Sequence, residues 1–184
     1  MNIFYLDSDF EKSAQYHIDK HIVKMPLEAV QLLTTTVWVD KFIGFVPRKL
    51  TSDELEVIKL EKAKQPSIEE RTFTRYLPTH PNHPCAIWAR SSMDNYEWLF
   101  NYLIFIADEY TYRYGKIHAS MQEANRMPSP INFPYLGVTQ LPQCMPEDYQ
   151  QESVIEAYRL YYKMDKASIA SWKKRNPPEW WTND

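Results

Sequence analysis

The chain has 184 residues and a formal net charge of −3, and 44% of its residues are hydrophobic. This length is enough for one well-cored domain, and because no linker-like stretch divides the chain we expect a single helical domain over residues 1–184. The acidic balance excludes a strongly basic nucleic-acid binder, so any contact with DNA must be local. Only three glycines occur, whereas hairpins and sheets need turn glycines and β-branched runs. We therefore predict an all-α fold, a compact helical bundle with long proline-rich loops.

The first predicted helix spans residues 9–38. Asp7, Ser8 and Asp9 offer side-chain caps at its start, and apolar residues then recur at helical spacing. Pro26 should kink this helix, because proline removes a backbone donor and clashes with the preceding turn at a cost of ~3 kcal/mol. A kink that costs this much suggests that the helix is bent in order to form a binding site.

Three further helices follow along the chain. We expect a charged helix over 52–64 in a solvated excursion, a central buried helix over 85–118 that Gly115 ends or kinks, and a last helix over 147–174. Segments 76–84 and 126–149 contain three and five prolines, respectively. Both are predicted to be loops, the first extended and the second ordered and rich in aromatic residues.

The two cysteines, Cys85 and Cys144, occur in a chain that opens without an apolar leader. We interpret them as free thiols of a cytoplasmic protein, with a disulfide between them as the less favoured alternative. The most apolar stretch, residues 98–107, is about half of the ~20 residues that a membrane span requires. No transmembrane helix is expected.

Four polar side chains of the first predicted helix follow one another at spacings of four, three and four: His17, His21, Lys24 and Glu28. A continuous helix would place them on one stripe about 60° wide, at the border of the apolar face. Burial at such a border shifts pKa values and holds side chains in place. We therefore predict that the four line one cavity and act as acid, base or amine. The alternative is an ordinary boundary stripe with a Lys24–Glu28 ion pair worth ~0.3 kcal/mol.

A second set of polar and aromatic residues is predicted to form the binding walls. Histidines 80 and 83 lie at a loop-to-helix junction, where ligands commonly bind, although capping of the following helix would equally explain them. Glu109 and Arg113 are either a buried structural pair or a clamp on an anion. The predicted substrate-binding residues are His80, His83, Trp88, Arg90, Asn95, Glu109, Tyr112, Arg113 and His118.

Metal binding has only weak support in the sequence. The pairs His17/His21 and His80/His83 would permit zinc, but the zincin motif requires glutamate directly after its first histidine, and position 18 is isoleucine. We expect neither a metal nor a cofactor. The sequence also lacks a Gly-rich phosphate loop, a Gly-x-Ser-x-Gly elbow and a Cys-x-x-Cys pair, which removes several standard enzyme classes.

Several motifs resemble known families. The opening AQYHIDKHIVKMPLEAVQLL, with NHPCAIWAR, NYEWL and PQCMPEDY, is similar over most of the chain to a family of phage and large-DNA-virus proteins. The pattern A-x-x-H-[IL]-x(6)-[LM]-P, from Ala14 to Pro26, also resembles the first helix of the phage pyrimidine-dimer DNA glycosylase and AP lyase family. The ending W-x-K-R-x-P-P-E-W, from Trp172 to Trp180, is similar in kind to the tail of that family.

This resemblance implies a compact helical enzyme in which the N-terminal amine attacks the sugar C1′ and a glutamate on the first helix stabilises the intermediate. Alignment places Lys24 at the position of that glutamate and Val23 at that of the preceding arginine, so only His17 carries over directly. Position 2 is Asn, a poor context for methionine removal. We hypothesise that a desolvated Lys24 serves as the Schiff-base amine and that Glu28, one turn further on, replaces the acid.

Together these features suggest a viral enzyme in the host cytoplasm, acting on an N-glycosidic or neighbouring bond of a nucleotide, in DNA or free. The supply of Tyr and Trp suits such a ligand, since stacking contributes about 1–3 kcal/mol per base. The alternative is a non-catalytic protein that binds and sequesters a host signalling nucleotide, and a third possibility is a structural or host-interaction protein.

Overall fold

The computed structural model describes residues 1–71 and 73–181, and within them it contains helices and loops but no strand. The predicted all-α fold is therefore confirmed, whereas the extent of the domain, 1–184, stays a prediction. No helix in the described part of the chain is long and apolar enough to cross a membrane. The α-helices are α1 (Phe10–Tyr16), α2 (Asp19–Phe42), α3 (Ser52–Ala63), α4 (Pro84–Ala89), α5 (Met93–Tyr114), α6 (Ala119–Ala124) and α7 (Val154–Asp165), and the 3-10 turns are η1 (Ile68–Glu70), η2 (Glu147–Tyr149) and η3 (Ala167–Ile169).

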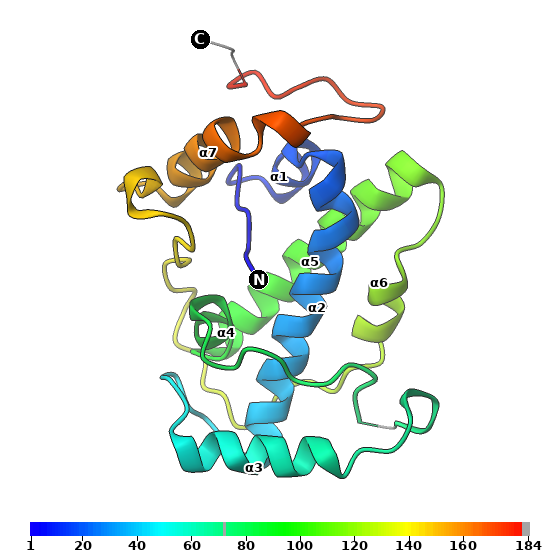
Figure 1. Cartoon of the computed structure of the whole chain (residues 1–184), viewed down its shortest axis with the longest axis vertical. Coiled ribbons are helices and arrows are strands. Elements are labelled where there is room, and N and C mark those ends of the chain that lie inside the picture. Colours follow the sequence, from blue (N-terminus) through cyan, green and yellow to red (C-terminus); the bar gives the residue numbers. More distant parts are fainter. Residues whose placement is uncertain (72, 182–184) are drawn as a thin grey trace.

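The two longest helices, α2 and α5, cross at the centre of the molecule and form its main helix pair (Figure 1). Their apolar faces share one core that includes Leu32, Leu33, Leu99 and Leu103, all of them fully buried. Helices α1 and α4 pack on this pair, while α3 and α7 lie at opposite ends of the long axis (Figure 1). The first residues of the chain run alongside the central pair.

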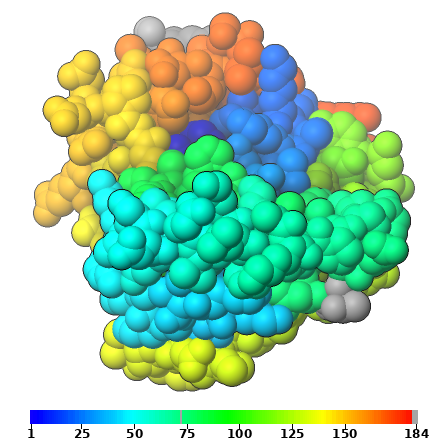
Figure 2. Space-filling view, turned by 60° about the horizontal axis from the view of Figure 1, so that its bottom comes forward, coloured from blue at the N-terminus to red at the C-terminus, as the bar shows by residue number. Residues whose placement is uncertain are grey.

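Helix α3 and the segment that follows it spread over one end of the molecule, as Figure 2 shows. The predicted helix over 52–64 is confirmed, and Thr51 and Glu54 form a reciprocal capping box at its start. Most of its side chains are exposed, but Ile58 is buried in a small second core with Val39 and Leu50. The excursion is thus anchored to the end of α2 rather than wholly solvated.

The prediction of one continuous helix over 9–38 is wrong, because the chain leaves helical geometry between α1 and α2. His17 and Ile18 are extended, with ψ of 136° and 154°. The buried guanidinium of Arg113 donates to the carbonyl oxygens of Gln15 and His17 at 2.9 Å each, and to Asp19 Oδ1 at 3.0 Å. These bonds satisfy carbonyls that a continuous helix would have used. Helix α2 then runs through Pro26 to Phe42.

The central helix predicted over 85–118 is also divided, into α4 and α5. Ser92 caps α5 by accepting the N–H of Asn95 at 3.1 Å, which sets a new helix start after the turn at residues 90–91. Gly115 ends α5 as expected, in the left-handed region at φ 71°. Helix α6 was not predicted.

The last helix, predicted over 147–174, is restricted to α7 with one 3-10 turn on either side. Ser153 caps α7 by accepting the N–H of Glu156 at 3.4 Å, so the helix cannot extend back to 147. The proline-rich segment 126–149 is a loop, as predicted. Asp40 holds it by accepting N–H groups of Ile131 and Asn132 at 3.0 Å each.

Candidate active site

A pocket of about 290 Å³ opens where the start of the chain passes between α2 and the end of α7. Its size is close to that of small-molecule sites, which begin at about 300 Å³. Its walls come from the first residues, from one face of α2, from the proline-rich loop and from the region around the end of α7. The lining residues are Met1, Asn2, Phe4, His21, Lys24, Met25, Glu28, Cys144, Tyr161 and Lys166.

Glu28 is the acidic group of the pocket. It is only 7% exposed, and each of its carboxylate oxygens has one donor. Oε2 accepts the backbone N–H of Asn2 at 3.0 Å, and Oε1 pairs with Lys24 Nζ at 2.9 Å. The side chain of Lys24 is 64% exposed. The carboxylate therefore lies at the base of the pocket, and the ammonium group lies at its rim.

His21 forms a neutral wall of the pocket. Its Nδ1 shares a hydrogen bond of 2.6 Å with the hydroxyl of Tyr162, and its ring packs on Phe4 with centroids 4.3 Å apart. The pKa of His21 is lowered to about 3, mainly by burial and to a smaller extent by the nearby His17, Lys166 and Lys24. An imidazole with that pKa is uncharged at pH 7, so it can accept or donate a hydrogen bond but holds no proton to give away as an imidazolium.

His17 lies behind the pocket rather than in its wall. It is fully buried, donates from Nδ1 to the carbonyl of Ser13 at 2.8 Å, and has its ring 6.4 Å from that of His21. Its Nε2 has no hydrogen-bond partner among the described residues. Burial lowers its pKa to about 4. The structure thus brings three of the four predicted catalytic residues, His21, Lys24 and Glu28, to one cavity.

The sequence prediction missed the residues that the rest of the chain brings to this pocket. The side chain of Asn2 makes three hydrogen bonds, of which the shortest, 2.6 Å, comes from the hydroxyl of Tyr158. Tyr161 and Lys166 come from the end of α7, where Lys166 Nζ donates to the hydroxyl of Tyr161 at 3.1 Å. Helical spacing identifies the tyrosines only as a packing face. No local pattern shows that this face meets the start of the chain.

Most of the predicted substrate-binding residues lie away from the pocket and have structural partners. Arg90 donates to the carbonyl oxygens of Val46, Arg48 and Pro81, and Asn95 donates to the carbonyl of Trp88 at 2.8 Å. Because Arg90 has no exposed surface, a ligand cannot reach its guanidinium. His80 is exposed on the loop before α4.

The other predicted substrate-binding residues also lie outside the pocket. Glu109 and Arg113 form a buried ion pair at 2.6 Å, and Arg175 pairs with the same Glu109 carboxylate at 2.8 Å. This arrangement fits a buried structural pair rather than a clamp on an anion. Tyr112 is 48% exposed beside this group, and the ring nitrogen Nδ1 of His118 caps α6.

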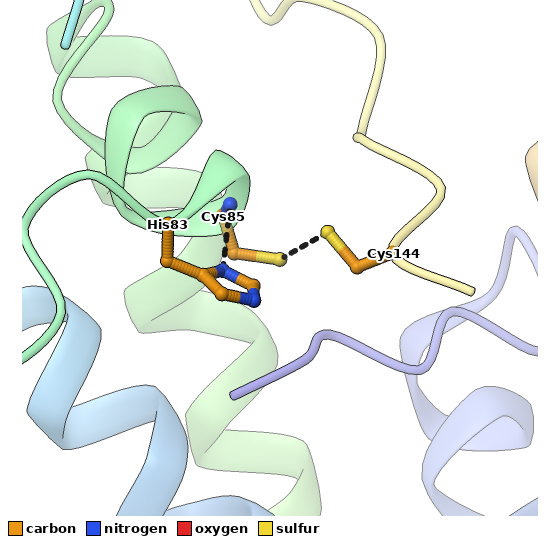
Figure 3. A group of neighbouring side chains, drawn as sticks. All are labelled: His83, Cys85 and Cys144. Atoms are coloured by element: carbon orange, nitrogen blue, oxygen red, sulfur yellow. Dashed lines mark hydrogen bonds between the residues drawn. The ribbon is translucent and has the colours of Figure 1, made fainter. Parts of the chain in front are cut away.

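His83 alone of this set lies near the pocket. It caps α4 by accepting the N–H of Cys85 at 3.2 Å, and its ring is close to both cysteines (Figure 3).

The fold and the pocket together define an all-helical protein in which the start of the chain lies against a buried carboxylate, with lysines at the pocket rim. A family model described as pyrimidine dimer DNA glycosylase matches residues 1–123, and the chain therefore belongs to this family. The match confirms the resemblance that the first-helix motif indicated. It includes Asn2, His21 and Glu28 but not the part of the chain that supplies Tyr161 and Lys166. Comparisons with curated proteins and with solved structures found no match.

Proposed function

We propose that this protein is a DNA glycosylase that releases a damaged base through attack of a primary amine at the sugar C1′, with Glu28 as the acid–base group. The observation that carries the proposal is the 3.0 Å contact between the backbone nitrogen of Asn2 and Glu28 Oε2. A nucleophile and its base must lie within about 2.6–3.2 Å of each other. Membership of a DNA glycosylase family gives DNA as the substrate class.

Two amines are candidates for the nucleophile. Lys24 is one, but its side chain is 64% exposed, and it therefore lacks the desolvation that activates lysine amines and that our hypothesis required. The other is the α-amine at residue 2, which removal of Met1 would create on the atom that already contacts Glu28. Asn2 is a poor context for this removal, and the geometry of the contact is what favours the α-amine over Lys24. We favour the α-amine as nucleophile and assign Lys24 to binding at the pocket rim.

The proposed reaction uses the pocket as follows. The amine lone pair forms a bond to C1′ while the bond between C1′ and the base nitrogen breaks, and the base leaves after taking up a proton. Glu28 accepts the proton that the amine loses and passes it to the ring oxygen as the C1′–O4′ bond breaks, while water supplies the proton that the departing base takes up. Glu28 is then a carboxylate again, and its negative charge stabilises the cationic imine. His21, which is neutral, orients the sugar or base by hydrogen bonding.

Borohydride trapping tests this proposal, because it converts an imine into a stable covalent adduct. The protein would be incubated with UV-irradiated, abasic and undamaged duplexes, as the wild type, as Lys24→Ala and with a blocked N-terminus. We expect an adduct on damaged DNA that persists in Lys24→Ala and is lost on blocking. If the adduct were lost only in Lys24→Ala, the nucleophile would be the amine of Lys24 instead. The absence of any adduct, with tight binding and unchanged recovery of a nucleotide, would favour the sequestering alternative.

Mass spectrometry of the intact protein would accompany the trapping experiment. It shows whether the chain that forms the adduct begins at residue 1 or at residue 2. An adduct formed only by a chain that keeps Met1 would place the nucleophile one residue earlier than we propose. Lys59→Ala is the matched lysine control, since Lys59 lies on α3 at the other end of the molecule.

A further inference from the structure

Three potential metal ligands meet beside the pocket: His83, Cys85 and Cys144. Their ligand atoms all lie within 4.8 Å of one another, and the two sulfur atoms are 3.4 Å apart. Figure 3 shows the two cysteines pointing toward each other, with the histidine ring next to Cys85. The Nδ1 atom of His83 accepts the N–H of Cys85, so Nε2 of the neutral ring carries the proton. Coordination through Nε2 would move that proton to Nδ1, and the metal bond would replace this capping hydrogen bond.

We propose that these three residues bind one zinc-class divalent metal ion. Thiolate and imidazole ligands select such ions, and Cys₂His with a fourth, exchangeable ligand is a known zinc coordination set. Two sulfur ligands at about 2.3 Å from zinc in tetrahedral geometry lie about 3.8 Å apart. The observed separation of 3.4 Å requires a shift of only a few tenths of an ångström, whereas a disulfide at about 2.05 Å would require the sulfurs to approach by more than 1 Å.

The site is preformed by contacts that do not involve a metal. His83 and Cys85 are fixed at the N-terminal end of α4, where Pro84 occupies the first helical position. Cys144 lies 59 residues after Cys85 in the proline-rich loop. Its carbonyl accepts Asn2 Nδ2 at 2.8 Å, and its N–H donates to the hydroxyl of Tyr158 at 3.4 Å. These contacts set the backbone positions of the ligands, and a bound metal would in addition link the loop to the start of α4.

The proposed metal site also contacts the pocket, because Cys144 lines both. Through its carbonyl, Cys144 holds Asn2, whose backbone nitrogen contacts Glu28. A bound metal would stabilise this arrangement by fixing the loop. The inference rests on the geometry of the three ligands and does not depend on glycosylase activity.

Metal titration of the reduced full-length chain tests the site. Zinc would be titrated in competition with a chromophoric chelator, and cobalt would be added separately to detect the absorption band of thiolate coordination. We expect one metal per chain, and affinity reduced roughly 100-fold or more in Cys144→Ser and in His83→Asn. Asparagine is a good helix cap, so His83→Asn keeps the start of α4 while removing the Nε2 ligand.

His80→Asn is the matched control, because His80 is an exposed histidine three residues earlier on the same loop, and it should bind metal like the wild type. Circular dichroism would establish that each variant is folded. The proposal is overturned if the reduced wild type binds no metal or if Cys144→Ser binds it equally. Glu28→Gln should keep the metal while losing the DNA adduct, which separates this proposal from the glycosylase proposal.

Discussion

Glu28 is the residue on which the proposed chemistry depends most directly. The change Glu28→Gln keeps the size of the side chain but removes the charge that accepts a proton and stabilises the imine. We expect the single-turnover rate of adduct formation to fall roughly 100-fold or more. Quantitative trapping on an abasic duplex measures this rate. Glu56→Gln, on the exposed surface of α3, is the control, and comparable rates in both variants would remove Glu28 from the mechanism.

The two buried histidines make stability depend on pH. In the unfolded chain each imidazole gains a proton near its ordinary pKa of 6.5, whereas burial lowers the pKa of His17 to about 4 and that of His21 to about 3. The unfolded state therefore binds more protons below pH 6.5, and stability is lost as the pH falls from there. We expect the free energy of unfolding to decrease by roughly 2–4 kcal/mol between pH 7 and pH 5.

Urea denaturation at a series of pH values measures this loss. His17→Asn removes one titrating group and keeps a donor near the carbonyl of Ser13, so it should show about half the decrease. An identical pH dependence in wild type and variant would show that His17 does not titrate on unfolding.

At the level of single residues, the sequence identifies the part of the site that lies on one helix. Helical spacing brings His21, Lys24 and Glu28 together because all three belong to α2. It cannot include Asn2 or Lys166, which reach the pocket only through packing of the chain ends. Helical spacing also groups His17 with these residues, but only if the helix is continuous, and the break at residues 17–18 places His17 in the core.

At the level of elements, the positions of the helices were predicted better than their ends. The break between α1 and α2 is imposed by Arg113, which is 96 residues away from His17 in the sequence. The helical spacing of apolar residues continues through residues 17–18, so it does not indicate that the helix is broken there. Similarly, Ser92 is one serine among several, and only the folded structure shows that it caps α5. Local patterns therefore indicate that helices exist, while the tertiary contacts of Arg113, and a local cap that is one of several candidates, mark where helices end.

The energetic importance of this break can be measured with Arg113→Ala. The substitution would leave two backbone carbonyls without their buried donor and would leave Arg175 as the remaining cationic partner of Glu109. We expect the free energy of unfolding to fall by about 3–5 kcal/mol, the usual result of removing one partner from a buried ion pair. Arg126→Ala is the comparison, since Arg126 is an exposed arginine 4.0 Å from its partner, and its loss should be within about 1 kcal/mol.

Urea denaturation of both variants makes this comparison. If Arg113→Ala does not fold, Arg113→Lys provides the second test, because a single ammonium cannot reproduce the forked contacts of a guanidinium. Equal stability of the Arg113 and Arg126 variants would mean that the break between α1 and α2 has another cause.

At the level of the whole molecule, composition was sufficient to predict the helical class but not the assembly of the pocket. Few glycines and little β-branched alternation favour helices over sheets, and this indication does not depend on which helices pack together. The pocket instead requires the start of the chain and the end of α7 to meet across α2, a contact between segments more than 150 residues apart. Contacts of this kind carry no local pattern.

The distribution of charge over the whole molecule predicts how DNA binding depends on salt. The net charge is −3, so attraction to phosphates must come from the few cations near the pocket, including Lys24 and Lys166. We expect the logarithm of the binding constant to fall with the logarithm of salt concentration with a slope of about −2 to −4, which corresponds to a few phosphate contacts. Fluorescence anisotropy with a UV-irradiated duplex measures this slope.

Lys166→Ala should make that slope less steep by about one, since each lysine that contacts a phosphate releases about one counterion. Lys59→Ala, at the opposite end of the long axis (Figure 1), should leave it unchanged. The reverse result would place the DNA on α3, and because the pocket would then be too distant to reach a base, the proposed assignment of the active site would fail with it. A slope near zero in the wild type would mean that the lysines near the pocket contact no phosphate of the duplex, which would contradict the proposed position of the DNA.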